Sequence, residues 1–292
     1  MASDFAVLIL THGRPDSVIT FTNLRRHGYT GPIYVVVDNE DDTIEAYRER
    51  FGEAVIQFDK KAIAATFDQG DNLEDRRTVV FARNAAFGIA EQLGLAYFLE
   101  LDDDYTGFWY KFDSNLVYAA DKHVKDLDRL FATYLDFYKS VPALTLAMDQ
   151  NGDFVGGRWG AFGAKLWLKR KAMNTFFCST KRPFTFVGRV NEDVSTYVSE
   201  GNRGQLFLTA PNAAITQVST QKGKGGMSDV YLSEGTYLKT FYTVMYAPSC
   251  VKVSEMGPKH KRIHHRINWR TAVPKIVSEE LRKGKRDSLG DR

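Results

Sequence analysis

Three consecutive carboxylates, Asp102, Asp103 and Asp104, are the residues of this sequence best suited to chemistry. They directly follow a short aromatic-rich apolar run that begins at Tyr97, and such a run predicts a buried strand. Three ionised Asp side chains at close range repel one another, and Mg²⁺ or Mn²⁺ would relieve that repulsion by binding carboxylate oxygens. The carboxyl end of a central strand is also where open α/β sheets bind ligands. We therefore predict a metal site here; the alternative is a solvated acidic turn.

A second acidic pair, Glu192 and Asp193, follows another apolar run. A carboxylate on the far side of a reacting centre could act as a general base toward an acceptor hydroxyl. The alternative is an acidic pair at a helix N-terminus, where the helix dipole favours negative charge.

Arg83 lies in a helix predicted over residues 75–94, directly before the strand that ends in the Asp cluster. Apolar residues recur there at steps of three or four, as expected for one buried helix face. We predict that Arg83 points at the crevice of the Asp cluster and contacts a diphosphate; the alternative is an exposed arginine.

The elements that must position these residues alternate between strands and helices. Strands are predicted at 5–10, 33–37 and 54–58, with helices between them that end near residues 28 and 50. This alternation predicts a parallel sheet with helices on both faces. Polar residues follow the first two strands: Thr11, His12, Gly13 and Arg14 after the first, and Asp38 after the second. Further along, a helix is predicted at 117–138 and strands at 143–148 and 205–210.

The composition bounds the class of protein. The 292 residues are 43% hydrophobic, which suits one large α/β domain with a C-terminal appendage. The net charge is only +3. Two cysteines, Cys178 and Cys250, are too few for a disulfide framework and fit no zinc spacing. The apolar run near the N-terminus is too short for a signal or membrane segment, so we expect a soluble, cytoplasmic protein.

The C-terminal region is strongly basic. Between residues 259 and 270 it concentrates lysines, arginines and histidines. The basic residues that could bind a ligand are Lys261, Arg262, His264, His265, Arg266 and Arg270. One interpretation is a surface that binds nucleic-acid phosphates, and the other is a solvated basic surface.

Together, Thr11–Arg14, Arg83, the Asp cluster and Asn191–Asp193 resemble a GT-A fold glycosyltransferase over roughly residues 5–215. The resemblance implies an α/β fold with a Rossmann-like mixed sheet flanked by helices, and a basic C-terminal extension. It implies a domain over 1–250, with a nucleotide-sugar half at about 1–110 and an acceptor half at about 111–250. Residues 251–292 would then pack on the active site. Asp102 and Asp104 match the family's Asp-x-Asp motif, whose first Asp contacts the ribose and whose last Asp binds the metal.

The same resemblance implies the ligands. The donor would be a nucleotide-sugar, with UDP-sugar the first choice, and the cofactor Mn²⁺ or Mg²⁺. Asp102 and Asp104 would hold the metal together with His264 or His265. The spacing of the two histidines in the sequence does not show which one is the ligand. The donor would be bound by the polar residues after the first two strands, by Arg83 and by the first two residues of the Asp cluster. Glu192 or Asp193 would supply the base of an inverting enzyme.

The C-terminal segments Lys261–Trp269 and Val273–Ile276 resemble, more narrowly, phage glycosyltransferases associated with TET/JBP-type oxygenases. This implies transfer of a sugar, with UDP-glucose a candidate donor, to 5-hydroxymethylcytosine in phage DNA. Lys261, Arg262, Arg266 and Arg270 would bind that DNA, and neither a membrane nor an obligate protein partner is expected. The alternatives are a saccharide or protein acceptor, a metal-dependent nucleic-acid-processing module, or a nucleotidyltransferase of related fold.

Overall fold

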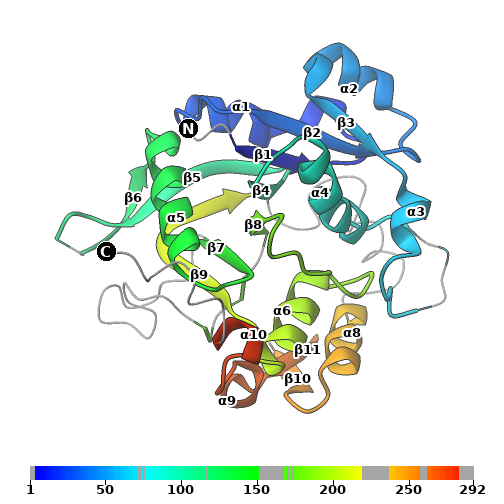
Figure 1. The fold of residues 1–292 in the computed structure, drawn as a ribbon, viewed down its shortest axis with the longest axis vertical. Helices are drawn as coiled ribbons and strands as arrows, with labels where there is room; N and C mark the ends of the chain where they lie inside the picture. Colours follow the sequence, from blue (N-terminus) through cyan, green and yellow to red (C-terminus); the bar gives the residue numbers. More distant parts are fainter. Residues whose placement is uncertain are drawn as a thin grey trace.

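A nine-stranded sheet forms the centre of the computed structural model, which describes residues 4–71, 74, 76–115, 117–150, 168–169, 171–172, 174–218, 237–256 and 262–282 (Figure 1). The strand order is β3-β2-β1-β4-β8-β7-β9-β5-β6. The strands are β1 Phe5–Leu10, β2 Ile33–Asp38, β3 Val55–Phe58, β4 Tyr97–Asp102, β5 Tyr105–Phe112, β6 Tyr118–His123, β7 Thr145–Gln150, β8 Thr175–Ser179 and β9 Phe207–Gln217.

The sheet is parallel in one half and mixed in the other. Strands β3, β2, β1 and β4 are parallel neighbours, as strand–helix alternation predicted. The parallel arrangement ends at β4, because β8 pairs antiparallel with it. A mixed sheet is the arrangement that the family resemblance implied. The carboxyl ends of β1, β2 and β4 therefore meet at one edge of the sheet, where ligands bind in open α/β folds.

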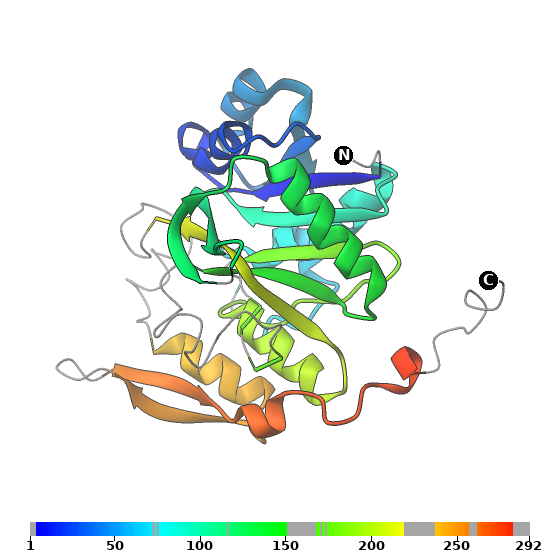
Figure 2. The ribbon, with the colours of Figure 1, turned by 90° about the vertical axis from the view of Figure 1, so that its left-hand side faces the viewer.

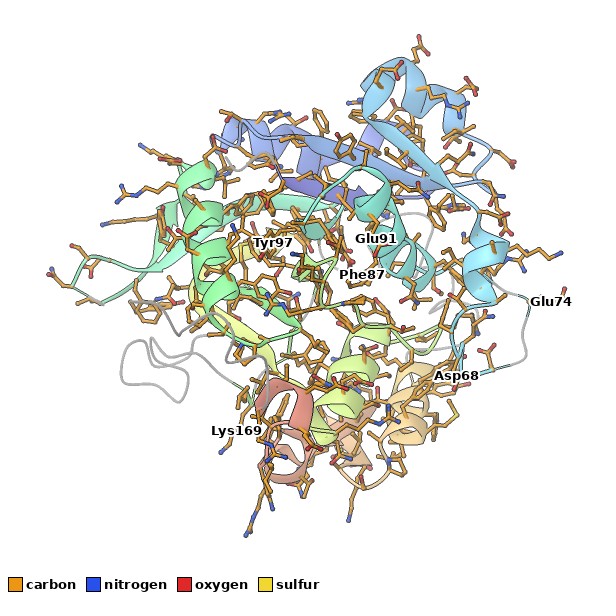
Figure 3. All side chains as sticks on the ribbon, in the orientation of Figure 1. Asp68, Glu74, Phe87, Glu91, Tyr97 and Lys169 are labelled. Atoms are coloured by element: carbon orange, nitrogen blue, oxygen red, sulfur yellow. The ribbon has the colours of Figure 1, made fainter. Side chains whose placement is uncertain are left out.

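Helices cover both faces of the sheet. They are α1 Ile19–Arg26, α2 Ile44–Phe51, α3 Lys60–Ala64, α4 Val80–Gln92, α5 Leu127–Ser140, α6 Glu192–Asn202, α8 Leu238–Tyr246, α9 Trp269–Ala272 and α10 Glu279–Arg282, with 3₁₀ turns η1 Pro15–Ser17 and η2 Gly52–Ala54. Alternate residues of β1 enter two apolar layers, Val7 with α1 and α5 and Leu8 with α4 and α6. Phe87 points from α4 into the second layer, where its ring meets those of Phe98 and Phe184 (Figure 3). A strand buried on both faces explains why β1 reads as a continuous apolar run.

Two predicted helices begin later than expected. The helix predicted at 117–138 is wrong in its first part, because residues 118–123 form β6 and pair antiparallel with β5. The helix α5 starts only after Asp126, whose side chain accepts a hydrogen bond from the Arg129 N–H. The helix predicted at 75–94 is α4, which starts at Val80. Cross-strand pairing with β5, which residue periodicity does not reveal, decides the first of these differences.

The C-terminal part forms its own small sheet. Strands β10 Val251–Met256 and β11 Arg262–Ile267 pair antiparallel. The helix α9 packs on α6, where the rings of Trp269 and Tyr197 stack with centroids 5.8 Å apart. Residues 283–292 of the predicted basic segment lie outside the described residues. The division into donor and acceptor halves stays a prediction.

Within the described ranges, no helix is both long enough and apolar enough to cross a membrane. Both cysteines, Cys178 and Cys250, are free and buried.

Candidate functional site

The buried guanidinium of Arg83 joins the Asp cluster to the second acidic pair. Its Nη2 donates to Asp102 Oδ1 over 2.9 Å, and its Nε donates to Glu192 Oε1 over 3.0 Å. Its Nη1 lies 3.7 Å from Oε2 of Glu100. The side chain of Arg83 is only 1% exposed, whereas that of Asp102 is 25% exposed. The structure thus brings the end of β4, the first turn of α4 and the start of α6 to one point, and Arg83 faces the Asp cluster as predicted.

Burial and charge perturb the acids around this arginine. Burial acts to lower the pKa of Arg83, but the charges of Asp102, Glu192 and Glu100 raise it well above its usual value. Burial raises the pKa of Glu100 to about 8 despite the nearby guanidinium. Among the residues that the structure describes, neither carboxyl oxygen of Glu100 has a hydrogen-bond partner. Arg83 therefore stays charged and is the counter-ion for a set of buried carboxyls, a role that a neutral side chain could not fill.

The middle residue of the Asp cluster is held by the loop after β1. Asp103 accepts a hydrogen bond from Thr11 Oγ1 over 2.6 Å, and its Oδ1 lies 3.0 Å from Nη2 of Arg14. Burial raises the pKa of Asp103 to about 6, although the charge of Arg14 acts to lower it. Tyr47, from α2, contacts both loop residues: its hydroxyl lies 2.9 Å from Thr11 Oγ1 and accepts from the Arg14 N–H over 2.8 Å. Asp103 thus orients the loop, and sequence reasoning missed Tyr47.

The last residue of the cluster fits a cation site. Asp104 Oδ1 is buried and has no hydrogen-bond partner in the described part of the chain. Burial, followed by the charges of Asp102 and Asp103, raises its pKa to about 7. A bound divalent cation would coordinate this oxygen and reduce the repulsion between the three carboxylates. Carboxylate oxygens are the ligands that Mn²⁺ and Mg²⁺ prefer, so these residues fit either ion. Among the described residues, no three His, Cys, Asp or Glu side chains are arranged to hold a metal. The ligand set Asp102, Asp104 and a histidine therefore stays a prediction.

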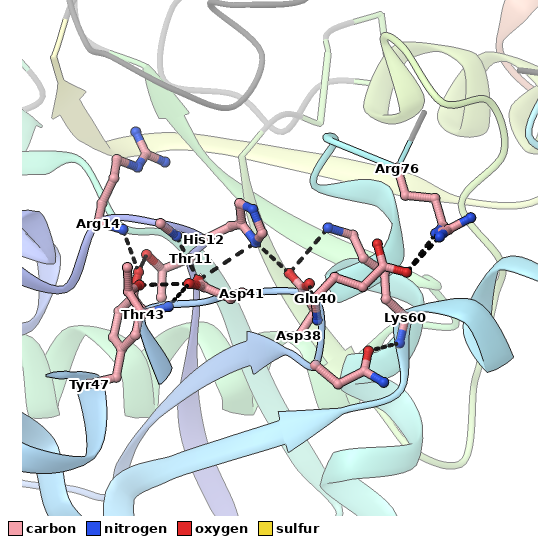
Figure 4. A network of polar contacts seen from close by, with 12 residues as sticks. Thr11, His12, Arg14, Asp38, Glu40, Asp41, Thr43, Tyr47, Lys60 and Arg76 are labelled. Carbon is pink, nitrogen blue, oxygen red and sulfur yellow. Dashed lines mark hydrogen bonds and ion pairs between the residues drawn. The ribbon is translucent and has the colours of Figure 1, made fainter. Parts of the chain in front are cut away.

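A second polar network lies at the ends of β1 and β2 (Figure 4). The ring of His12 lies 2.7 Å from Asp38 Oδ2, and the ammonium of Lys60 lies 3.2 Å from the same oxygen. The backbone N–H of Gly13 donates to Asp41 Oδ2 over 2.6 Å. Burial acts to raise the pKa of Asp38, but the hydrogen bond from His12 and the charge of Lys60 lower it overall.

The predicted donor residues after β1 and β2 are thus brought together, and two further residues join them. Sequence reasoning missed Lys60 because it lies in the first turn of α3, a helix that the sequence analysis did not predict. Asp41 belongs to the acidic stretch after β2, but no pattern separated it from its neighbours. Buried ionisable groups gathered at strand ends are typical of functional sites.

The pair Glu192 and Asp193 opens α6, so it does lie at a helix N-terminus. Asp193 Oδ1 accepts a hydrogen bond from the Val194 N–H over 2.7 Å. Burial raises the pKa of both carboxyls. The preceding residue, Asn191, has a left-handed backbone with φ of 60°. The helix-terminus interpretation is therefore confirmed. Glu192 also contacts Arg83, and the role of the pair as a base stays a prediction.

His264 and His265 lie on β11 with buried ring nitrogens. Within the described ranges, His264 Nδ1 and both ring nitrogens of His265 have no hydrogen-bond partner. Burial, followed by the charge of Lys171, lowers the pKa of His264 to about 4 and that of His265 to about 3. Lys171 also acts on the pKa of Asp193, so β11 lies in the same electrostatic neighbourhood as the start of α6. Neutral imidazoles with unpaired nitrogens are suited to metal binding.

The predicted nucleic-acid residues divide into two groups. Arg262, Arg266 and Arg270 are exposed. Lys261 lies outside the described residues.

Comparison with known proteins identifies the family. The model of the TET-associated glycosyltransferase family matches residues 5–226. The chain belongs to this family and is a glycosyltransferase. The fold class implied by the sequence resemblance, an α/β fold of GT-A type with a mixed sheet, is confirmed. No curated protein matches the chain.

Solved structures show a more distant similarity. S. aureus TarS 1–349 in complex with UDP is 14% identical over 83% of this chain and 65% of that one, with a TM-score of 0.45. Glucosyl-3-phosphoglycerate synthase from Mycobacterium tuberculosis in complex with Mg²⁺ and UDP is 9% identical over 90% and 87%, with a TM-score of 0.47. Mannosyltransferase PcManGT from Pyrobaculum calidifontis in complex with GDP-Man and Mn²⁺ is 12% identical over 83% of this chain and 73% of that one, with a TM-score of 0.45. Similarity at this level assigns neither a donor nor an acceptor.

Proposed function

We propose that this glycosyltransferase moves a sugar from a UDP-sugar, with Mn²⁺ or Mg²⁺, to the hydroxyl of 5-hydroxymethylcytosine in DNA. The observation that carries the proposal is the Arg83 guanidinium, which joins the Asp-x-Asp residue Asp102 to the acid pair at Glu192. A donor-binding carboxylate and a candidate base are thereby fixed relative to each other. Fixed relative positions of reacting groups lower the activation barrier of a transfer reaction.

The donor would lie across the carboxyl ends of β1, β2 and β4. Asp38, held between His12 and Lys60, suits contact with the nucleotide base, and the loop Thr11–Arg14 borders it. Arg14 keeps 33% of its side chain exposed while it pairs with Asp103, so its charge can also face a diphosphate. These residues form the donor side of the proposed site.

Asp102 and Asp104 would hold the cation, with His264 or His265 as the further ligand. The bound cation would neutralise charge on the departing nucleoside diphosphate. The support on the protein side is the unpartnered Asp104 oxygen and its raised pKa. The neutral imidazoles on β11 add support for a histidine ligand.

The base would come from the acid pair. Glu192 already accepts a hydrogen bond from Arg83, which fixes its carboxylate but also reduces its basicity. Asp193 is therefore our first choice for the group that removes the acceptor proton, and Glu192 for the group that positions the helix end. Burial raises the pKa of Asp193, which makes it a stronger base than a free carboxylate.

DNA is favoured as the acceptor by two independent features. The family is TET-associated, and that association implies 5-hydroxymethylpyrimidines as the oxidised bases to be modified. The exposed arginines of the C-terminal segment suit phosphate contacts. A saccharide or protein acceptor would not call for such a basic surface.

One assay tests both halves of the proposal. The protein is incubated with Mn²⁺ and a panel of nucleotide sugars, and nucleoside diphosphate release is measured with and without 5-hydroxymethylcytosine DNA. We expect the DNA to stimulate release from a UDP-sugar and to gain the mass of one sugar per modified base. Release that is stimulated only by a saccharide or protein acceptor would overturn the DNA assignment. Release from GDP-sugars alone would overturn the donor assignment.

A further inference from the structure

The strands β10 and β11 form a two-stranded ribbon at the edge of the molecule. In Figure 2 the two strands run along the lower edge of the chain and extend past α8. The inner end packs on the body through Val251, 1% exposed, and His265, 5% exposed. On the same face, Val253, which lies directly opposite His265, is 48% exposed, and Ile263, farther from Val251, is 43% exposed. The ribbon is therefore anchored at one end and open to solvent at the other.

One face of this ribbon is basic. Lys252 on β10 lies directly opposite Arg266 on β11, and Arg262 lies on the same face because strand side chains alternate. All three are exposed. Like charges directly opposite each other destabilise a strand pair. Such an arrangement is stabilised by a partner with closely spaced negative charges, and a nucleic-acid backbone is such a partner.

The shape of the ribbon matches one groove of DNA. Two paired strands of six residues form a ribbon about 20 Å long, with strands about 4.8 Å apart. The major groove of B-DNA, about 12 Å wide, admits a two-stranded ribbon, whereas the minor groove is about half as wide. The 5-position of a pyrimidine points into the major groove, where thymine carries its methyl group.

We propose that the β10–β11 ribbon enters the major groove of duplex DNA beside the base to be modified, with Lys252 and Arg266 on the phosphates. The inference rests on the proposed function and adds to it that the acceptor is double-stranded. It also assigns a DNA contact to Lys252, which the sequence analysis did not single out. The ribbon packs on α8, which also packs on α6, the helix whose first turn contains Asp193. A duplex held by the ribbon would thus lie next to the candidate base.

The test combines chemical footprinting with binding to a duplex that contains 5-hydroxymethylcytosine. Dimethyl sulfate methylates guanine N7 in the major groove and adenine N3 in the minor groove, so the two grooves are read separately. We expect the wild type to protect guanine N7 near the modified base. The double variant Lys252→Ala/Arg266→Ala should lose this protection and bind the duplex at least about tenfold more weakly at low salt. Two lost phosphate contacts would also reduce the salt slope by about 1.8, at about 0.9 per contact.

A matched variant removes the same charge elsewhere. Lys125→Ala/Arg129→Ala deletes two exposed cations around the start of α5 and should keep wild-type footprints and affinity. Thermal unfolding of both double variants checks that the fold is intact, since all four side chains are exposed.

Three outcomes would overturn the ribbon assignment. They are equal binding by the two double variants, protection confined to adenine N3, and equal affinity of the wild type for single strands and duplexes. Sugar transfer to hydroxymethylated DNA separates this failure from failure of the proposed function. If transfer proceeds while any of the three outcomes holds, only the ribbon assignment is wrong. If no DNA is modified with any donor, the proposed function itself fails.

Discussion

The Nε atom of Arg83 lies 3.0 Å from Oε1 of Glu192, although 109 positions separate the two residues in the chain. The same guanidinium holds Asp102, so α6 cannot shift without disturbing the end of β4. One buried side chain therefore connects the helix that carries the acid pair to the strand that carries the Asp-x-Asp residues. Because a positioned base must stay within hydrogen-bond reach of its proton, this connection bears directly on the transfer step.

Replacing Arg83 should destabilise the folded protein. We expect Arg83→Met to lower the free energy of unfolding by about 3–5 kcal/mol, because Glu100 and Glu192 would lose their buried counter-ion. The matched control is Arg76→Met, which breaks a partly exposed pair with Glu40 and should cost at most about 1 kcal/mol. Urea unfolding of both variants gives the comparison. Equal losses in the two variants would show that Arg83 is no more important to the fold than a surface arginine.

Asp104 should be required for the metal but not for the fold. We expect Asp104→Asn to abolish Mn²⁺-dependent UDP binding in titration calorimetry. The metal-free variant should be at least as stable as the wild type, because its buried carboxyl is repelled by two neighbours. Asp136→Asn, at an exposed position on α5, is the control and should bind UDP normally. Unchanged Mn²⁺-dependent binding by Asp104→Asn would leave the Asp cluster with a structural role alone.

The rate of transfer should depend on pH through the acid pair. Burial raises the pKa of Glu192 and Asp193, and a base works only when ionised. The turnover number should therefore fall as the pH is lowered, with a midpoint above the value of about 3.9 for a free aspartate. Asp193→Asn should lower turnover by about 10²–10⁴-fold with little change in the KM for the donor. A variant that kept wild-type turnover and pH dependence would place the base elsewhere or indicate a retaining mechanism.

Local patterns in the sequence located the residues of the site. The end of β4, the loop after β1 and the start of α6 each combine an apolar run with an abrupt polar stretch, so their places in the fold were predictable. Arg83 was predictable as well, because α4 directly precedes β4. Its bond to Glu192 depends on how two distant helices pack, and no spacing along the chain reports that.

Other features could not be predicted from local sequence patterns, because only the tertiary structure determines them. Residues 118–123 form a strand because β5 lies beside them, not because of their own periodicity. Tyr47 and Lys60 reach the site from short helices whose sequences look like ordinary surface segments. The insertion of β8 beside β4 follows from strand order, which local sequence patterns leave open.

The contact between α6 and α9 should be sensitive to a single methyl group. A Cβ atom added at Gly201 would lie 2.7 Å from the carbonyl oxygen of Ala272, which is backbone and cannot move aside cheaply. Gly201→Ala should therefore push α9 away from α6 and disturb the stacking of Trp269 on Tyr197. We expect a loss of about 1–3 kcal/mol, as is usual when a packed contact is overfilled.

Gly88 offers a matched control on α4, because a Cβ added there meets nothing within 4 Å. Gly88→Ala should be neutral or stabilise by about 0.5–1 kcal/mol, since alanine favours helix more than glycine does. Urea unfolding of the two variants measures the difference, and duplex binding at low salt measures its effect on the attached β11 strand. If the ribbon is positioned by this contact, Gly201→Ala should weaken duplex binding while Gly88→Ala leaves it unchanged. Equal stability in the two variants would mean that α9 is free to move and does not fix the ribbon.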